Sequence, residues 1–580
     1  MSHASQKTSQ PNVDNWHSSL ATERSTQSFR KPEPSCADEP PFGDGPFQLL
    51  SLLNVVLAAA AYVLHYESFR MTAGVMDHWC RRPEAFANLS VQQWKELAIP
   101  VDKQGVYSRC TVREPPYSSA NNRVVPCTSW EFDLSEYGNN AVSEWVLVCD
   151  RAWLISLARL VYAAACIFPT PVVSRLADRV GRKVVVFVTI PVVLISGVAS
   201  SLPNDFQFFV AVRAVVSAAT SCTMVPLFAT MWEVCPPRKT PIYCIVFILV
   251  TMVISDSTVS TAEQLKAGWA TVQLVLMVPT FLLVGLYFTV EESPSWLVAT
   301  GRVGEAERIS QRLAKLNGVP TSRCRELFAL QTRTHMRDAA ENLKQSDPCN
   351  ARLRSHSILV FYMWTALSYA QDSYVTNDGI PVRVLVKVIV AVTSLSACVL
   401  FTRWVHHYGP KRTVVVSGLG FSASLAALTA TPLEEDTLLL DLLVIVMKTT
   451  GYITFSNFGV LTMQLYPVTA HCTATAIALI CNRVGDTLAQ MSTVLIGPRW
   501  HLGNGLAFAA VTSALFVIAG EHLPDEPGTG AFGMPVHKRS SPGEDLKRIF
   551  RETLKPLGKK RAKQGEKKIR RKQSTNLLRY

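Results

Sequence analysis

Charged side chains interrupt several long apolar runs of this sequence, and these residues are the ones best suited to bind a charged ligand. Basic members outnumber acidic ones: they are Arg159, Arg213, Lys387, Lys448 and Arg483, against Asp256 and Asp486. At the centre of a bilayer each such charge costs at least about 2.5 to 3.5 kcal/mol unless it is paired or hydrated. Several basic groups around one cavity would therefore favour an anionic ligand. The alternative is a structural ion pair of Arg483 with Asp256 or Asp486.

The same runs carry aromatic side chains that could bind the apolar part of an organic ligand through ring stacking or cation–π contacts. The candidates are Tyr243, Phe247, Phe361, Trp364, Tyr369, Tyr374, Tyr452 and Phe455. Most aromatic residues in such runs pack against neighbouring helices or anchor them at the membrane interface, so packing is the alternative for each of them.

The elements that must position these residues are predicted to be transmembrane helices. About 20 mostly apolar residues cross a hydrocarbon core of about 30 Å. Twelve runs of that kind occur, at 47–66, 153–174, 184–202, 206–231, 241–261, 270–290, 356–375, 382–404, 413–431, 437–458, 470–495 and 504–520. Charged residues make up 17% of the 580 residues, below the roughly 25% of a typical soluble domain. The sequence predicts an all-α membrane protein with twelve spans.

Basic residues mark the cytoplasmic side, because Lys and Arg are enriched in short cytoplasmic loops. They gather after the second, fourth and eighth runs, at Arg175, Arg179, Arg182, Lys183, Arg238, Lys239, Lys411 and Arg412. We therefore expect both termini to be cytoplasmic and the 67–152 segment to lie outside.

The 67–152 segment has the features of an oxidised, extracellular loop. Its four cysteines, Cys80, Cys110, Cys127 and Cys149, suit two disulfides, and three pairings are possible. Asn88 begins an Asn-Leu-Ser glycosylation sequon in the same segment.

Three polar segments flank or divide the apolar runs. We expect a disordered cytoplasmic tail over 1–44, a cytoplasmic central loop over 291–355 and a basic cytoplasmic tail over 523–580. The formal net charge is +13, and nine Lys or Arg residues lie between Gly558 and Lys572. A basic tail beside membrane spans favours anionic lipid head groups over nucleic acid. A solvated charge run without a ligand is the alternative.

Two short patterns recur six runs apart, which suggests a duplicated six-helix half. Asp178-Arg179-Val180-Gly181-Arg182-Lys183 is echoed by His406-His407-Tyr408-Gly409-Pro410-Lys411-Arg412. Glu233, Pro237 and Arg238 are echoed by Gln464, Pro467 and His471. In both cases the second copy has lost charged members.

These motifs resemble those of the major facilitator superfamily, and in particular the organic ion transporters of solute carrier family 22. The resemblance rests on Gly45 to Gln48, Asp77 to Cys80, Ser143 to Leu154, Leu176 to Lys183, Glu292 to Leu297, Gly301-Arg302, Glu305-Ala306, Leu465 to Pro467 and Leu523 to Asp525. It implies two six-helix bundles, over 45–290 and 356–522, in a multi-pass protein of the plasma membrane. Transport would occur by alternating access.

The resemblance also implies a cytoplasmic gate that holds the outward-facing state. Its residues would be Asp178, Arg179, Gly181 and Arg182, with Arg213, Glu233 and Arg238 as partners. Simple positive-inside anchoring is the alternative for the basic members.

Arg483-Val484-Gly485 is similar to the pattern of the family's organic anion and carnitine-type members, which favours an anionic or zwitterionic substrate. Arg159 and Cys398 depart from the family's pattern. The alternatives are an organic cation transporter or a receptor or scaffold that has lost transport, whereas the large first loop argues against a sugar-type proton symporter. Because phosphate-loop, zinc-helix and nucleophile-elbow motifs are absent, we expect neither an enzyme nor a cofactor.

Overall fold

The computed structural model describes residues 40–74, 76–102, 105–116, 123–135, 138–203, 205–236, 239–265, 268–342, 346–376, 384–430, 438–496 and 502–523. The predicted tails at 1–44 and 523–580 therefore lie almost wholly outside the described residues. Within some helices the side chains are also not described, and these include Asp256, Lys387 and Cys398.

The first half of the chain is built from helices, most of them long and apolar. They are α2 (Pro46–Thr72), α5 (Trp153–Ile167), α6 (Pro169–Val180), α7 (Arg182–Ala199), α8 (Phe206–Val234), α9 (Thr240–Leu265), α10 (Trp269–Thr280) and, after the 3₁₀ turn η4 (Phe281–Gly285), α11 (Leu286–Thr289). Helix α6 continues directly from α5, with Pro169 at its first position, where a missing N–H costs no hydrogen bond.

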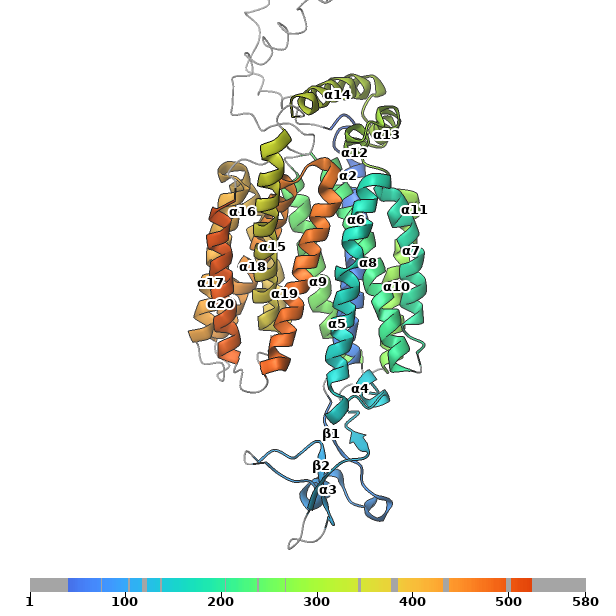
Figure 1. The fold of residues 1–580 in the computed structure, drawn as a ribbon, viewed down its shortest axis with the longest axis vertical. Helices are drawn as coiled ribbons and strands as arrows, with labels where there is room; N and C mark the ends of the chain where they lie inside the picture. The colour runs from blue at the N-terminus through green and yellow to red at the C-terminus, as the bar shows by residue number, and fades with distance from the viewer. Residues whose placement is uncertain are drawn as a thin grey trace, which may run out of the picture. The chain divides into compact units, whose positions relative to one another are not determined.

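The second half repeats this plan beside the first (Figure 1). Its helices are α15 (Ser346–Thr376), α16 (Val384–Tyr408), α17 (Pro410–Ala430), α18 (Leu438–Leu465), α19 (His471–Ile496) and α20 (Leu502–Glu521), with the 3₁₀ turn η6 (Val468–Ala470) before α19. Helix α19 contacts α5, α6 and α8 of the first half, and α18 contacts α9.

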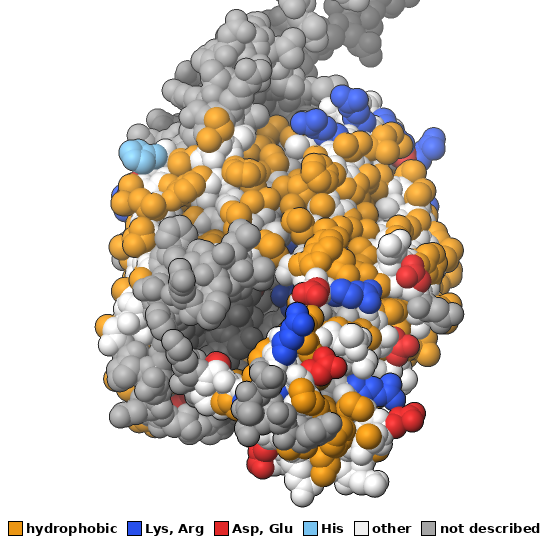
Figure 2. All heavy atoms as spheres, turned by 60° about the horizontal axis from the view of Figure 1, so that its bottom comes forward, with side chains coloured by type: hydrophobic (Ala, Val, Ile, Leu, Met, Phe, Trp, Pro, Cys, Tyr) orange, Lys and Arg blue, Asp and Glu red, His pale blue; other side chains and the backbone are white. Residues whose placement is uncertain are grey.

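Helices cover most of the described part of each of the twelve ranges that the sequence predicts, but 153–174 is divided between α5 and α6, and 270–290 among α10, η4 and α11. Among the described residues, seven helical segments are long and apolar enough to cross a membrane: 46–69, 149–180, 182–199, 206–234, 269–289, 410–430 and 438–465. Shorter apolar stretches lie in α9, α16 and α20. Figure 2 shows apolar side chains over much of the described outer surface of the helices, and Phe288 is 88% exposed. A surface of this kind suits lipid rather than water.

The 291–355 segment, predicted as a loop, contains helices α12 (Pro294–Ala299), α13 (Val303–Leu316) and α14 (Thr321–Asn342). Helix α13 buries Ala306, Ser310, Leu313 and Ala314, which share one face at helical spacing. That spacing is the signal that the prediction overlooked. These helices lie at the end of the bundle opposite the 77–152 segment (Figure 1).

The 77–152 segment departs from the predicted all-α class. Strand β1 (His78–Cys80) pairs antiparallel with β4 (Trp130–Phe132), and β2 (Thr111–Glu114) pairs antiparallel with β3 (Arg123–Pro126). Short helices complete it: η2 (Glu84–Phe86), α3 (Val91–Ala98), α4 (Ala141–Glu144) and η3 (Cys149–Arg151).

Disulfides and a small apolar core hold the 77–152 segment together. The disulfides join Cys80 to Cys127 and Cys110 to Cys149, with Cα–Cα distances of 5.4 and 5.6 Å. Trp94 of α3, only 1% exposed, is at the centre of the core. Two disulfides suit a segment too small to bury a large core.

Candidate functional site

The centre of the candidate site is Arg483 on α19, whose side chain lies against α2 of the first half. Its guanidinium donates from Nε to Tyr62 Oη and lies 4.6 Å from the Tyr62 ring and 3.7 Å from the Tyr66 ring. Nη1 is 3.2 Å from Asp486 Oδ2, one turn further along α19. Arg483 is 4% exposed. A buried charge that joins the two halves is thus held by an ion pair and by two aromatic rings.

Carboxylates and a carboxamide continue this site toward α15. Gln490 Nε2 donates to Tyr66 Oη at 2.9 Å and to Asp372 Oδ2 at 3.4 Å. Asp486 interacts electrostatically with Asp372 of α15 and with Glu67 of α2. The site is therefore of mixed charge, whereas the sequence predicted a mainly basic one. Of the two ion pairs offered for Arg483, the structure contains that with Asp486, and the Asp256 side chain lies outside the described residues.

A close approach between helices fixes the position of Arg483. Gly485, two residues along α19, faces α15 so closely that a Cβ atom there would lie 2.6 Å from the carbonyl oxygen of Thr365 and 2.7 Å from Ser368 Cβ. Ser368 Oγ donates to Asn482 Oδ1 across the same contact. Only glycine allows this approach, so α15 and α19 set where Arg483 and Asp372 lie relative to each other.

A second arginine cluster lies beside the first. Arg213 of α8, 5% exposed, donates to Ser68 Oγ at 2.7 Å and to the His65 carbonyl at 3.0 Å. Its guanidinium lies 5.1 Å from the Phe69 ring and 5.0 Å from the Tyr162 ring. These contacts bind α8 to α2 and α5.

Arg213, predicted as a partner of the cytoplasmic gate, has its described contacts with α2 and α5 instead. Arg213 precedes Glu233 by twenty residues on α8, which is about 30 Å along a helix. The second cluster nevertheless extends toward Arg483 and Arg159. The Tyr162 and Tyr66 rings are 6.1 Å apart, and Arg159 lies 5.8 Å from the Phe69 ring.

The aromatic residues that the sequence proposed lie mostly in the packed interior. Trp364 donates to Thr462 Oγ1 at 3.1 Å and packs against Phe455 and Phe458. Phe247, Tyr369 and Tyr452 are buried in the apolar cores of the two halves, and Tyr243 is half-buried beside the first core. Phe361 is 46% exposed, Lys448 is half-buried on α18, and the side chains of Tyr374 and Lys387 lie outside the described residues.

Sequence reasoning missed Tyr62, Tyr66, Asp372 and Gln490. Tyr62 and Tyr66 are spaced i and i+4, which places them on one face of α2, and this signal was available. The approach of Asp372 to Gln490 joins α15 to α19 and has no local signal in the sequence.

A second site joins the two halves at the end of the bundle near α13 and α14. It begins at Gly181, between α6 and α7, whose φ of +129° favours glycine and whose Cβ would lie 2.9 Å from Glu292 Oε2. Glu292 accepts hydrogen bonds from the backbone N–H groups of Arg182 at 2.9 Å and Lys183 at 3.1 Å, at the positive end of α7. Burial raises the pKa of the Glu292 carboxyl despite these hydrogen bonds.

Arg182, 1% exposed, is the hub of this second site. Its Nη2 lies 2.7 Å from Glu233 Oε1 and 3.4 Å from Asp178 Oδ1. The same nitrogen donates at 3.1 Å to the carbonyl of Val468 in the second half. Trp296 of α12 stacks on the guanidinium at 4.8 Å and donates to the Asp178 carbonyl at 2.9 Å.

Asp178 and Glu233 reach the first turn of α19. Asp178 accepts from the backbone N–H groups of Cys472 at 3.3 Å and Thr473 at 3.0 Å, and from Thr473 Oγ1 at 2.9 Å. His471 Nδ1 lies 3.0 Å from Glu233 Oε1. We call Asp178, Arg182, Glu233, His471 and Thr473 the latch. A carboxylate at a helix N-terminus is satisfied by free N–H groups and by the helix dipole, so the latch binds α19 to the first half.

The latch contains three of the predicted gate residues and omits others. Asp178, Arg182 and Glu233 lie in it and Gly181 supports it, whereas Arg179 is exposed and Arg238 lies outside the described residues. Sequence reasoning missed the roles of His471, Thr473, Glu292 and Trp296. His471 was visible as the last member of the second repeated pattern, but its partner Glu233 is 238 residues away.

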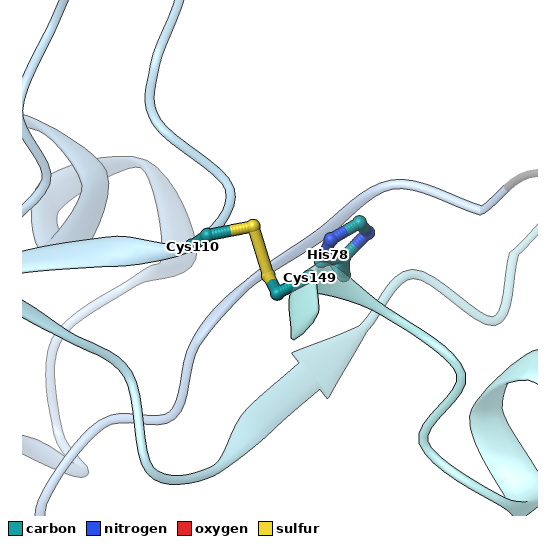
Figure 3. A group of neighbouring side chains, drawn as sticks. All are labelled: His78, Cys110 and Cys149. Carbon is teal, nitrogen blue, oxygen red and sulfur yellow. A yellow bond between two sulfur atoms is a disulfide. The ribbon is translucent and has the colours of Figure 1, made fainter. Parts of the chain in front are cut away.

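A third cluster, in the 77–152 segment, contains residue types that often bind metals, but its two cysteines are not free thiols. One ligand atom from each of His78, Cys110 and Cys149 lies within 4.8 Å of the others. The two sulfur atoms are joined in a disulfide (Figure 3), so they offer no thiolate to a metal. His78 Nδ1 is 3.0 Å from the Met76 carbonyl, and burial lowers the pKa of the His78 imidazole.

The two helical halves match one large family of membrane proteins. The model of that family, the Major Facilitator Superfamily, matches residues 152–490. The chain belongs to this superfamily. Its curated relatives include solute carrier family 22 member 7 of Rattus norvegicus, 25% identical over 82% of this chain and 93% of that protein. Member 6 from the same organism is 24% identical over 83% of this chain and 91% of that protein.

Another relative of this chain is a beta-alanine transporter of Drosophila melanogaster, which is 26% identical to it over 309 residues. That match spans about half of each protein, 48% of this chain and 51% of the relative. Among solved structures, the proton:xylose symporter XylE bound to 6-bromo-6-deoxy-D-glucose aligns with a TM-score of 0.58 and 13% identity, over 84% of this chain and 98% of XylE. At this identity the match supports the fold alone.

The resemblance to solute carrier family 22 is thereby confirmed, since relatives from that family match most of the chain. The known proteins that match this chain are transporters and not enzymes. This agrees with the lack of enzyme motifs in the sequence.

Proposed function

We propose that the protein carries small organic ions, anionic or zwitterionic, across the plasma membrane through twelve transmembrane helices that alternate access to a central site. The observation that carries the proposal is the position of Arg483, which lies at the contact between the halves, paired with Asp486 and stacked on Tyr66. A charged ligand at this contact interacts with both halves at once, which is what a substrate must do to move them relative to each other.

The chemistry of the site favours a carboxylate near a second, positive group. A guanidinium can bind a substrate carboxylate through two parallel hydrogen bonds. Asp486 lies 3.2 Å from the guanidinium, and Asp372 lies beyond Gln490. An ammonium group on the same substrate would face these carboxylates. Small zwitterions fit this arrangement, and one relative is named a beta-alanine transporter.

The latch and the 77–152 segment give the proposed orientation. The latch joins the halves at the end that bears α13 and α14, and the 77–152 segment lies at the opposite end (Figure 1). We assign the latch to the cytoplasm together with both termini, and the 67–152 segment to the outside. Asn88, which is exposed, would there accept a glycan.

Other predicted residues enter the proposal in secondary roles. Arg159 and the Arg213 cluster place further positive charge between α5, α8 and α2. Lys448, Lys387 and Asp256 are proposed contributors to substrate charge recognition from α18, α16 and α9. The basic tail at 523–580 is proposed to bind anionic lipid.

A second candidate function is organic cation transport. It is favoured by Asp486, which pairs with the buried Arg483 and also interacts electrostatically with the carboxylates of Asp372 and Glu67. An organic cation would reduce the repulsion among these carboxylates.

Uptake measurements separate the candidates. Cells that express the protein are offered a labelled monocarboxylate, beta-alanine and a quaternary ammonium ion. The variant Arg483→Gln removes the charge. Arg325→Gln is the matched control, because Arg325 is exposed on α14 and pairs with Glu307 of α13. We expect anion or zwitterion uptake that Arg483→Gln reduces at least about tenfold at equal surface expression and that Arg325→Gln leaves unchanged.

The other outcomes of the uptake experiment also distinguish between the candidate functions. Cation uptake that survives Arg483→Gln would support the second candidate. Absence of uptake for all three probes by a correctly inserted protein would contradict both and favour a receptor or scaffold.

A further inference from the structure

His471 of the latch has a hydrogen-bond acceptor at each of its two ring nitrogens. Nδ1 lies 3.0 Å from Glu233 Oε1, and Nε2 lies 3.2 Å from the carbonyl oxygen of Tyr466. A neutral imidazole carries one N–H and can donate to only one of them, so the other nitrogen would point a lone pair at an oxygen. The imidazolium donates to both. The geometry around His471 is thus complementary to the protonated ring.

The charges that face His471 also favour the protonated ring. Glu233, from α8, is fully buried, and its Oε1 accepts from both His471 and Arg182. Asp178, from α6, lies 3.4 Å from the same Arg182 nitrogen. Two carboxylates therefore share one guanidinium in this contact. A second positive charge at His471 balances them where water does not reach.

These charged groups are almost completely buried, so a change in the charge of His471 should have a large effect on the latch. His471 is 2% exposed, Arg182 1% and Glu233 0%. In a buried network, leaving one charged member without its partner is costly. Histidine is also the side chain whose unperturbed titration falls between pH 5 and 8.

We infer that the latch is sensitive to protons, and that protonation of His471 holds α19 against the first half. Acidification of the latch side slows its opening, and alkalinisation speeds it. The inference rests on the alternating access proposed above, since only a latch that opens can be controlled. It assigns His471 as the residue that links the transport cycle to the pH on the latch side.

The chain carries its own reporter of latch opening. Cys472 follows His471, is 0% exposed, and its Sγ accepts from Arg182 Nε at 3.4 Å. A membrane-impermeant maleimide applied to the latch side of inside-out vesicles can reach this thiol only when the latch opens. Mass spectrometry of the labelled peptide identifies Cys472 among the other cysteines. Labelling at each pH is divided by that of the denatured protein at the same pH, which corrects for the pH dependence of the maleimide reaction with an exposed thiol.

Two variants fix the charge at position 471. His471→Arg keeps a positive charge at every pH, and His471→Gln keeps a hydrogen-bonding side chain without charge. For the native protein we expect normalised labelling to rise on the order of tenfold between pH 5.5 and 8, in line with the loss of a hydrogen bond to a charged group. We expect His471→Arg to stay near the slow rate, and His471→Gln near the fast rate, across this range.

Three results would overturn the inference. The first is the same pH dependence in the native protein and in both variants. The second is a native rate that falls as pH rises. The third is no labelling of Cys472 in any variant while the denatured protein is labelled, which would contradict alternating access as well. If His471→Gln fails to reach the membrane, the comparison of the native protein with His471→Arg still decides, because only the native rate should vary with pH.

Discussion

Asp178 Oδ2 and the backbone nitrogen of Thr473 lie 3.0 Å apart, although 295 residues separate them in sequence. This hydrogen bond makes a carboxylate of the first half the cap of a helix of the second half. The cap gives the latch a defined register, because the N–H groups of Cys472 and Thr473 both point at the same side chain. Movement of the halves at this end must break these bonds together.

Removal of the cap should open the latch. Asp178→Ala leaves the first N–H groups of α19 without their acceptor, and loss of such a cap costs about 1 kcal/mol. We expect maleimide labelling of Cys472 to rise about fivefold or more at constant pH. Thr473→Ser retains the hydroxyl and is the matched control. Equal labelling of Asp178→Ala and the native protein would show that the cap does not hold the latch.

Gly181 should be intolerant of a side chain for two separable reasons. An alanine would adopt a φ of +129° and would place its Cβ 2.9 Å from Glu292 Oε2. Strain of this kind costs about 1 to 3 kcal/mol, so Gly181→Ala should lower the melting temperature of the purified protein. Gly301 also has a positive φ but has nothing within 4 Å of its Cβ, so Gly301→Ala reports strain without the contact. The φ of Gly301 is +83°, so similar shifts for both variants would mean that neither the wider φ of Gly181 nor the Glu292 contact adds a measurable cost.

Apolar length predicted where the helices lie, because twelve runs of about 20 residues can satisfy their backbone and bury their side chains in few other ways. The pairing of Arg483 with Asp486 was also open to prediction, since residues at i and i+3 share a helix face. Contacts between residues far apart in the chain could not be predicted in this way. The sequence analysis groups Arg213 with Glu233, although the predicted run 206–231 places them near its opposite ends. The contacts of α8 show that Glu233 lies in the latch and that Arg213 lies against α2, far from it.

The 77–152 segment shows the same limit. Four cysteines allow three pairings, and the strand registers that bring Cys80 to Cys127 and Cys110 to Cys149 depend on contacts far apart in the chain. The disulfide between Cys110 and Cys149, which lies beside His78 (Figure 3), was one of several pairings that the sequence left open.

Acid should loosen the sheet between β1 and β4 through Glu131. Partial burial by itself raises the pKa of Glu131, but hydrogen bonds from Arg82 and Trp79 outweigh it and hold the pKa below the ordinary value of a glutamate. A carboxyl whose pKa is lowered on folding contributes stability above its unfolded pKa, of about 4.3, and loses it as the pH falls through the folded pKa.

Hydrogen–deuterium exchange of the 78–82 and 130–132 peptides tests this prediction. We expect protection, corrected for the intrinsic exchange rate, to fall as the pH drops below about 4.3. Glu131→Gln should have weaker protection at neutral pH and little further loss in acid. Glu96→Gln, at an exposed position of α3, controls for general acid effects. Parallel acid dependence in Glu131→Gln and the native protein would assign the loss to another group.

Gly485 should be essential to the site because it lets α15 and α19 touch. A Cβ at this position would lie 2.6 Å from the Thr365 carbonyl oxygen and 2.9 Å from the Tyr369 nitrogen, both backbone atoms that cannot rotate away. Gly485→Ala must therefore push the helices apart, and overpacking of this kind costs about 1 to 3 kcal/mol. The shift would separate Arg483 and Gln490 from Asp372, so we expect a lower melting temperature together with at least about a tenfold loss of uptake. Gly459→Ala on α18, where nothing lies within 4 Å of the added atom, is the matched control and should retain both. Full uptake by Gly485→Ala would show that the spacing of α15 and α19 does not set the geometry of the substrate site.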